Sequence, residues 1–167
     1  PEVKLIYVMR DPVMRSWSAV MKLRRERGLK SVPSGEEAIH YARTEGVWKR
    51  SSYLDCIERV ERVFRRDQIF YGFFEQLAED PTAFVSGLLN FLGVEPGDVA
   101  RLLPPAPVNV AAGGRKPPPE FSRALAAACL PWVETLCERF EGPPQSWRAY
   151  YAALLSEGAP SHSEARA

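Results

Sequence analysis

The sequence predicts an α/β fold in which a few parallel strands are joined by many helices. Two apolar segments rich in β-forming residues, 3–9 and 68–74, are separated by segments with helical periodicity. Strands that alternate with helices are typical of parallel sheets. With 46% apolar residues, a chain of 167 residues can bury one core. We therefore expect one domain over residues 1–156, followed by a disordered polar tail over 157–167.

The first strand and the first helix are predicted from adjacent signals. Residues 3–9 (VKLIYVM) are apolar at every position but one, which favours a strand covered on both faces. Asp11 is a good helix cap and Pro12 suits the first helical position, so a helix should begin here. Gly28 ends it. The apolar stripe of this helix consists of Val13, Trp17, Val20 and Met21.

Two further helices are expected before the second strand. Ser34 and Glu37 have the spacing of a capping box, which opens a helix that reaches about Arg43. The next helix has one apolar face, formed by Tyr53, Cys56, Ile57, Val60, Val63 and Phe64.

The helices after the second strand have similar signals. Asp80 and Pro81 again predict a capped start, and Gly93 closes that helix. A segment rich in Pro, Ala and Gly follows at 103–119. Helical periodicity then returns, with a bend or break expected at Pro131. A last packed segment is indicated by Trp147, Tyr150, Tyr151, Leu154 and Leu155.

Composition excludes several classes of protein. The net charge of +1 does not suggest a general polyanion binder, although seven basic residues lie between Arg10 and Lys30. A solvated helix face and a nucleic-acid site both explain such a cluster. The sequence contains no run of 18 apolar residues, so it predicts no membrane span. The three cysteines lack metal-ligand spacing, so we expect reduced thiols, a cytoplasmic protein and no metal.

Arg10 stands where the first strand ends and the first helix begins. Ligands of open α/β sheets bind beyond the carboxyl ends of the strands, and free N–H groups at a helix N-terminus favour an anion. A guanidinium here suits a phosphate. Ser18 offers a hydroxyl about two turns into the helix. The alternatives are an ion pair of Arg10 with Asp11 or Glu26, and a serine that only packs on the helix.

Residues 10–18 (RDPVMRSWS) resemble the signature of sulfotransferases that use 3'-phosphoadenosine 5'-phosphosulfate (PAPS). The resemblance implies that Arg10 and Ser18 bind the 3'-phosphate of PAPS, whereas Arg15 supports the local structure. It covers residues 3–95 well and continues more weakly to about Trp147. It also implies a P-loop-NTPase-like sulfotransferase fold, truncated at the N-terminus, with PAPS as co-substrate.

A second candidate for nucleotide binding is the basic segment 113–117 (GGRKP). Glycine lets backbone N–H groups approach phosphate oxygens, which adjacent cations neutralise. Many sulfotransferases close over the nucleotide with a basic loop at this point, which implies contacts from Gly114, Arg115 and Lys116. Gly113 replaces the lysine that leads this loop in the family. The alternative is a flexible proline-rich linker.

Two aromatic residues stand where the family often places a ring near the adenine. These are Tyr53 and Trp48. Tyr53 is therefore a candidate nucleotide contact, but it also fits the apolar face of its helix. A core role is the alternative for this residue.

The sulfuryl-transfer groups of the family are not found in this sequence. Family members carry a phosphate-binding loop with a lysine after their first strand, and a His or Glu base further along. The first core strand here begins almost at residue 1, which is Pro rather than Met. We therefore expect missing upstream sequence, before Pro1, to carry the catalytic residues. The complete gene product is then an active sulfotransferase, and residues 1–167 alone are inactive.

The acceptor is not specified by any motif. The resemblance implies a hydroxyl or amine on a small molecule or carbohydrate, with residues 28–50 and 103–119 contributing to its pocket. Phenols, lipids and polyketides also remain open. Two other functions remain open as well: a catalytically dead structural or interaction remnant, and a module that binds phosphate or nucleic acid through the basic cluster.

Overall fold

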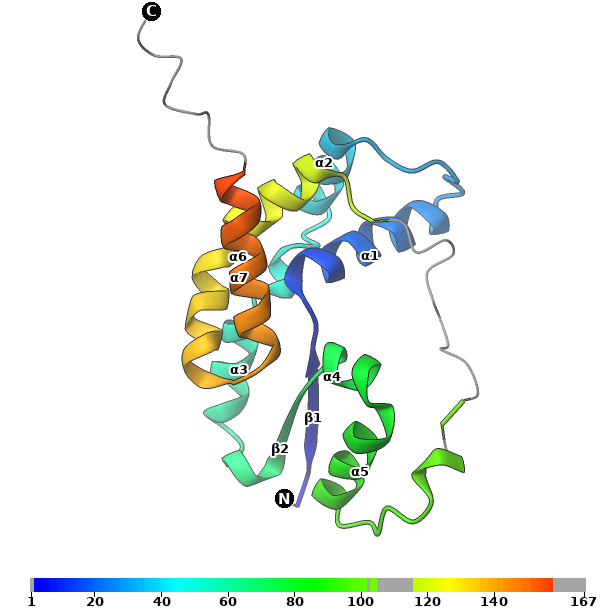
Figure 1. Cartoon of the computed structure of the whole chain (residues 1–167), viewed down its shortest axis with the longest axis vertical. Helices are drawn as coiled ribbons and strands as arrows, with labels where there is room; N and C mark the ends of the chain where they lie inside the picture. Colours follow the sequence, from blue (N-terminus) through cyan, green and yellow to red (C-terminus); the bar gives the residue numbers. More distant parts are fainter. Residues whose placement is uncertain (1, 102, 105–115, 158–167) are drawn as a thin grey trace, which may run out of the picture. The chain divides into compact units, whose positions relative to one another are not determined.

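The computed structural model of the chain describes residues 2–101, 103–104 and 116–157, and divides into two compact units. The first unit comprises Pro1–Arg10 and Tyr53–Lys116, and the second comprises Asp11–Ser52 and Pro117–Ala167. The predicted α/β class is confirmed, because the described residues form two parallel strands and seven α-helices (Figure 1). The predicted tail falls almost wholly outside the described residues.

The first unit contains the parallel sheet. Its strands are β1 (Leu5–Met9) and β2 (Ile69–Phe73), with Leu5 opposite Ile69 and Met9 opposite Phe73. Figure 1 shows the strands side by side, and α5 (Pro81–Leu92) contacts β2. Both predicted strands are confirmed, each slightly shorter than the apolar run that predicted it. The remaining helices of this unit are α3 (Tyr53–Glu61), α4 (Phe74–Glu79) and two short 3-10 helices, Arg66–Gln68 and Val99–Arg101.

The two faces of β1 are covered unequally. Tyr7 lies edge-on to the rings of Tyr53 and Tyr71, with centroids 6.1 and 6.2 Å apart. Ile6 and Val8 point to the other face and remain 47% and 43% exposed. Helix α5 packs on the neighbouring strand β2, and it leaves the side chains of Ile6 and Val8 on β1 partly uncovered. The prediction that both faces of this strand are covered is therefore wrong for Ile6 and Val8.

Gly72 in β2 makes room for α5. A Cβ added at Gly72 would lie 2.7 Å from the Phe84 ring and 2.9 Å from the Phe70 ring. These two rings meet edge-on, with centroids 5.7 Å apart. The glycine that weakens the strand pattern thus allows the helix to approach the sheet closely.

The helix ends in the first unit follow the predicted signals at α5 but not at α3. The Asp80 carboxylate accepts a hydrogen bond from the Ala83 N–H at 2.9 Å, and Gly93 ends α5 with a φ of 79°. In contrast, α3 ends at Glu61. Val63 lies beyond this end and is 74% exposed, so its predicted place on the apolar face is wrong. Because Val63 is not in the helix, helical periodicity does not determine the direction of its side chain.

The second unit is a group of helices. It contains α1 (Pro12–Glu26), α2 (Gly35–Thr44), α6 (Pro119–Arg139), α7 (Pro143–Ser156) and the 3-10 helix Lys49–Ser51. Figure 1 shows α6 and α7 side by side, and α6 also contacts α1 and α2. Its fully buried large side chains include Val13, Val20, Phe121, Val133, Leu136 and Tyr151.

The predicted starts of α1 and α2 are confirmed. Asp11 caps α1 by accepting from the Met14 N–H at 2.8 Å, and Ser34 caps α2 by accepting from the Glu37 N–H at 3.2 Å. The Glu37 carboxylate is engaged by Arg24, whose side chain is buried. The acidic half of the predicted capping box thus ties α2 to α1.

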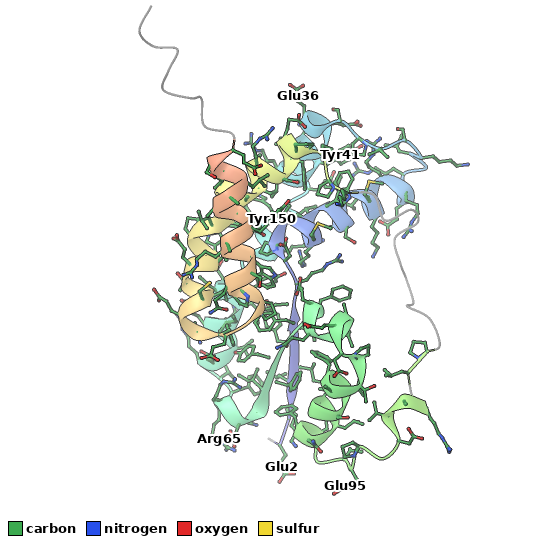
Figure 2. All side chains as sticks on the ribbon, viewed as in Figure 1. Glu2, Glu36, Tyr41, Arg65, Glu95 and Tyr150 are labelled. Atoms are coloured by element: carbon green, nitrogen blue, oxygen red, sulfur yellow. The ribbon has the colours of Figure 1, made fainter. Side chains whose placement is uncertain are left out.

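Of the bend or break predicted at Pro131, the break is wrong, because α6 continues from Pro119 to Arg139, and the bend stays a prediction. A proline inside a helix leaves the carbonyl four residues earlier without its donor, here that of Ala127. Both Pro131 and Ala127 are exposed, so water can hydrate that carbonyl. The last predicted segment is confirmed as α7, which buries Trp147 and leaves Tyr150 53% exposed (Figure 2).

Candidate functional site

Arg10 is the first residue after β1 and belongs to the first unit. Its backbone is held by Tyr53. The Arg10 N–H donates to the Tyr53 hydroxyl at 3.2 Å, and the same hydroxyl donates to the Arg10 carbonyl at 2.6 Å. The conformation at the exit of the strand is therefore fixed by one side chain from α3.

The Arg10 guanidinium has an unsatisfied donor. Its Cζ lies 4.6 Å from the centroid of the Phe74 ring, and its Nε is buried without a hydrogen-bond partner among the described residues. Within the described part of its unit, Arg10 has no ion pair. Buried donors are almost always satisfied in native proteins. An anion is the partner that such a cation favours.

The acidic residues weighed as partners of Arg10 are engaged in the second unit. Asp11 accepts from the Met14 N–H at 2.8 Å and from the Tyr151 hydroxyl at 3.1 Å. Glu26 pairs with Lys22 at 3.8 Å. These interactions account for both carboxylates.

Ser18 belongs to α1 in the second unit. It is half-buried, and its hydroxyl makes no hydrogen bond within the part of that unit that the structure describes. Its neighbours in sequence on the apolar stripe, Trp17 and Val20, are buried. Ser18 thus lies at the border of that stripe.

The N-terminus of α1 differs from the sequence-based expectation of free N–H groups. Pro12 has no N–H, and the Val13 N–H donates to the Tyr151 hydroxyl at 3.2 Å. The Met14 N–H donates to the Asp11 carboxylate, and the Arg15 N–H donates to the Asp11 carbonyl at 2.8 Å. The expected help of these N–H groups in holding an anion is therefore wrong. Side chains must hold any anion bound here.

Tyr151, which sequence reasoning treated only as packing, completes this cap from α7. Burial raises the pKa of the Tyr151 phenol far above its usual range, and the charge of Asp11 raises it further. The phenol therefore stays protonated and donates to Asp11. Burial likewise raises the pKa of the nearby Cys129 thiol to about 12. No local signal in the sequence links Tyr151 to a helix start 140 residues earlier.

Arg15 supports the local structure, as the resemblance implied. Its Nη1 donates to the Ser51 hydroxyl at 3.2 Å. That hydroxyl also lies 3.2 Å from the Ser16 hydroxyl, and both serines are buried. Arg15 thus joins α1 to the 3-10 helix that ends at Ser51.

The other predicted nucleotide contacts are partly described. Tyr53 is 3% exposed and Trp48 packs on Trp132, with ring centroids 6.0 Å apart. Lys116 is exposed. Gly114 and Arg115 lie outside the described residues.

Part of the basic cluster between Arg10 and Lys30 is paired. Lys22 pairs with Glu26, Arg24 with Glu37, and Arg27 with Glu45. The guanidinium groups of Arg24 and Arg27 also lie 5.5 Å from the ring centroid of Tyr41, which is labelled in Figure 2. Three of the seven cations are thus compensated within the second unit, which favours the structural explanation over a nucleic-acid site.

In the described ranges, no group of three or more His, Cys, Asp or Glu is placed to hold a metal ion. None of the helices described combines the length and apolar character that crossing a bilayer requires. The three cysteines are free thiols, of which Cys129 is buried.

The parallel strand pair with its intervening helices defines an α/β protein with an arginine at a strand exit. Residues 1–104 match the sulfotransferase domain family, so the chain belongs to this family. It is also similar to the crystal structure of a sulfotransferase from Alicyclobacillus acidocaldarius, with 27% identity and a TM-score of 0.60. The predicted family and fold are confirmed.

The match with this structure covers 87% of the present chain and 57% of the other. The chain therefore spans little more than half the length of the solved sulfotransferase. A comparison with curated proteins found no match.

Proposed function

We propose that the chain provides the 3'-phosphate part of the donor site of a PAPS-dependent sulfotransferase, with Arg10 as its central residue. The observation that supports this proposal is the buried Arg10 Nε without a hydrogen-bond partner among the described residues. A dianionic phosphate ester would satisfy this donor and offset the cost of burying the cation.

The remaining contacts of the donor site are proposed from the sequence resemblance. Ser18 would donate its hydroxyl to the same phosphate, and Arg115 and Lys116 would add positive charge, with the Gly114 N–H beside them. The first-turn N–H groups of α1 are already bonded within the second unit. Apart from the Gly114 N–H, the proposed phosphate site therefore depends on side chains, which makes it sensitive to single substitutions.

Binding the 3'-phosphate contributes to catalysis through orientation. Sulfuryl transfer resembles phosphoryl transfer, in which alignment and charge stabilisation supply most of the catalysis. Contacts with a remote part of the donor can thus be used to hold the reacting sulfuryl group in line. PAPS, when bound, supplies that group; Arg10 and Ser18 fix the end of the nucleotide away from it.

We also propose that the groups acting on the sulfuryl group lie in the share of the family fold that this chain does not cover. Residues 1–167 alone should then give no transfer from labelled PAPS. The proposed acceptor is a hydroxyl or amine of a small molecule or carbohydrate, and the proposed compartment is the cytoplasm, where free thiols stay reduced.

The proposal is tested by titrating 3',5'-adenosine bisphosphate in a calorimeter into the complete gene product, which we call the full-length protein. Arg10→Ala is expected to weaken binding by about 10- to 100-fold, because it removes a charge-assisted contact. Ser18→Ala, which removes one neutral donor to a charged group, is expected to weaken it by about 5- to 20-fold.

A matched control is Arg25→Ala on the same helix as Ser18. Arg25 is exposed, and its loss changes the net charge by the same amount as the loss of Arg10. It should leave the affinity within about 2-fold, because exposed charges are screened by solvent. Equal losses from Arg10→Ala and Arg25→Ala would show general charge attraction in place of a phosphate site.

A further inference from the structure

We infer that Tyr53 is a positioning residue for Arg10, since its hydroxyl fixes the backbone from which the guanidinium projects. This inference rests on the proposed function of Arg10. It assigns Tyr53 a role that acts through another residue, in place of a contact with the nucleotide.

Tyr53 makes a pair of hydrogen bonds with the backbone of one residue. The Arg10 N–H donates to the Tyr53 hydroxyl at 3.2 Å, and the hydroxyl donates to the Arg10 carbonyl at 2.6 Å. The pairing of β1 with β2 ends at Met9, opposite Phe73. Arg10 is thus the first residue that the sheet no longer holds, and the tyrosine supplies the two bonds that a strand partner would otherwise provide.

The Tyr53 ring is itself held in place. Tyr53 is the first residue of α3, is 3% exposed, and lies edge-on to Tyr7 of β1, with centroids 6.1 Å apart. A buried ring with two side-chain torsions has little freedom. Its hydroxyl therefore presents both bonds to Arg10 from a fixed place.

The hydrogen-bonding capacity of the Tyr53 hydroxyl is limited. A tyrosine hydroxyl has one proton to donate, and here the Arg10 carbonyl accepts it. The hydroxyl therefore has no second proton to give to a phosphate oxygen. This separates positioning from direct binding.

The consequence for the guanidinium is preorganisation. With the Arg10 backbone fixed and its Cζ 4.6 Å from the Phe74 ring centroid, few side-chain conformations remain to be lost on binding. Loss of the hydroxyl should leave the guanidinium present but less well placed.

The test is Tyr53→Phe, which removes the hydroxyl and keeps the ring. We expect the full-length protein to bind 3',5'-adenosine bisphosphate on the order of 5- to 20-fold more weakly in calorimetry. In the Arg10→Ala background, the same change should have no further effect, because Tyr53 acts only through Arg10. The control is Tyr71→Phe. Its hydroxyl donates to Glu61 at 3.0 Å in the same unit, and its loss should leave the affinity unchanged.

A second readout needs no nucleotide. In Tyr53→Phe, the backbone amide of Arg10 should exchange its hydrogen faster, whereas the amides paired between β1 and β2 should keep their rates. Unchanged exchange at Arg10 would contradict the inference.

The outcomes separate this inference from the proposed function. If Arg10→Ala weakens binding and Tyr53→Phe does not, the inference fails and the proposed function stands. If Tyr53→Phe weakens binding by the same factor with and without Arg10, the tyrosine contacts the nucleotide and the inference also fails. If Arg10→Ala leaves the affinity unchanged, the proposed function fails and the inference with it.

Discussion

Arg10 shows how one residue can combine a fixed backbone with an unsatisfied side chain. Tyr53 bonds both of its main-chain groups, and Phe74 lies beside its guanidinium, yet its Nε is buried without a partner among the described residues. The Nε of Arg24 is also buried without a partner among the described residues, but Arg24 pairs with Glu37, whereas Arg10 has no ion pair within the described part of its unit. Such local conflicts with the rules of stable packing are expected at functional positions.

The buried thiol of Cys129 predicts a pH dependence of stability. Burial, with a contribution from the charge of Asp11, raises its pKa from 9.0 to about 12. Between these values the unfolded chain has released the proton and the native chain retains it, so stability is complete below pH 9.0 and falls as the pH rises. Urea unfolding should show this thiol contributing a loss of about 1.4 kcal/mol per pH unit above its unfolded pKa.

The comparison for this prediction is Cys129→Ala, which should lose stability less steeply over the same pH range. Cys56→Ala removes a half-buried thiol and serves as the control with the parental slope. Burial raises the pKa of Tyr151 from 10.0, so Tyr151 adds to the slope above pH 10.0 in all three proteins. Identical slopes in the parent and Cys129→Ala would refute this account of the buried thiol.

For single elements, local signals in the sequence specified where three of the seven described α-helices begin. Asp11, Ser34 and Asp80 all cap the helices that they predicted. The errors occurred where tertiary structure outweighs local pattern. The apolar period runs past the end of α3 to Val63, and Pro131 sits in a helix whose packing outweighs the loss of one hydrogen bond.

Gly72 gives a prediction about the packing of α5 on β2. Gly72→Ala should destabilise the protein by about 1–3 kcal/mol, because the new methyl group would overlap the rings of Phe84 and Phe70. Gly87→Ala is the matched control inside α5. Its added Cβ meets nothing within 4 Å, so this change should stabilise the protein by about 0.5–1 kcal/mol. Chemical unfolding measures both, and equal stability of Gly72→Ala and the parent would exclude the close approach as the reason for the glycine.

At the scale of the whole molecule, the sequence was sufficient for the family and the α/β class. The α/β class came from strands that alternate with helices, and the motif at residues 10–18 led to the family. The hydrogen bonds of Tyr151 at the start of α1, and those of Tyr53 with the Arg10 backbone, could not be predicted from the sequence. Each depends on a side chain that folding brings to a distant backbone group, 138 residues away for Val13 and 43 for Arg10.

The two residues proposed to bind the 3'-phosphate belong to different units of the chain. Arg10 belongs to the first unit and Ser18 to the second, and the proposal that one phosphate engages both rests on the family motif. The structure itself supports the role of Arg10, whose contacts with Tyr53 and Phe74 lie within the first unit. A decisive measurement should therefore isolate the contribution of the 3'-phosphate at Arg10.

That measurement is the ratio of the affinities for 3',5'-adenosine bisphosphate and adenosine 5'-monophosphate, determined by calorimetry on the full-length parent protein and on Arg10→Ala. The two ligands differ only in the 3'-phosphate. We predict that the parent prefers the bisphosphate by about 10- to 100-fold and that Arg10→Ala reduces this preference to about 2-fold. An unchanged preference in Arg10→Ala would show that Arg10 does not bind the 3'-phosphate.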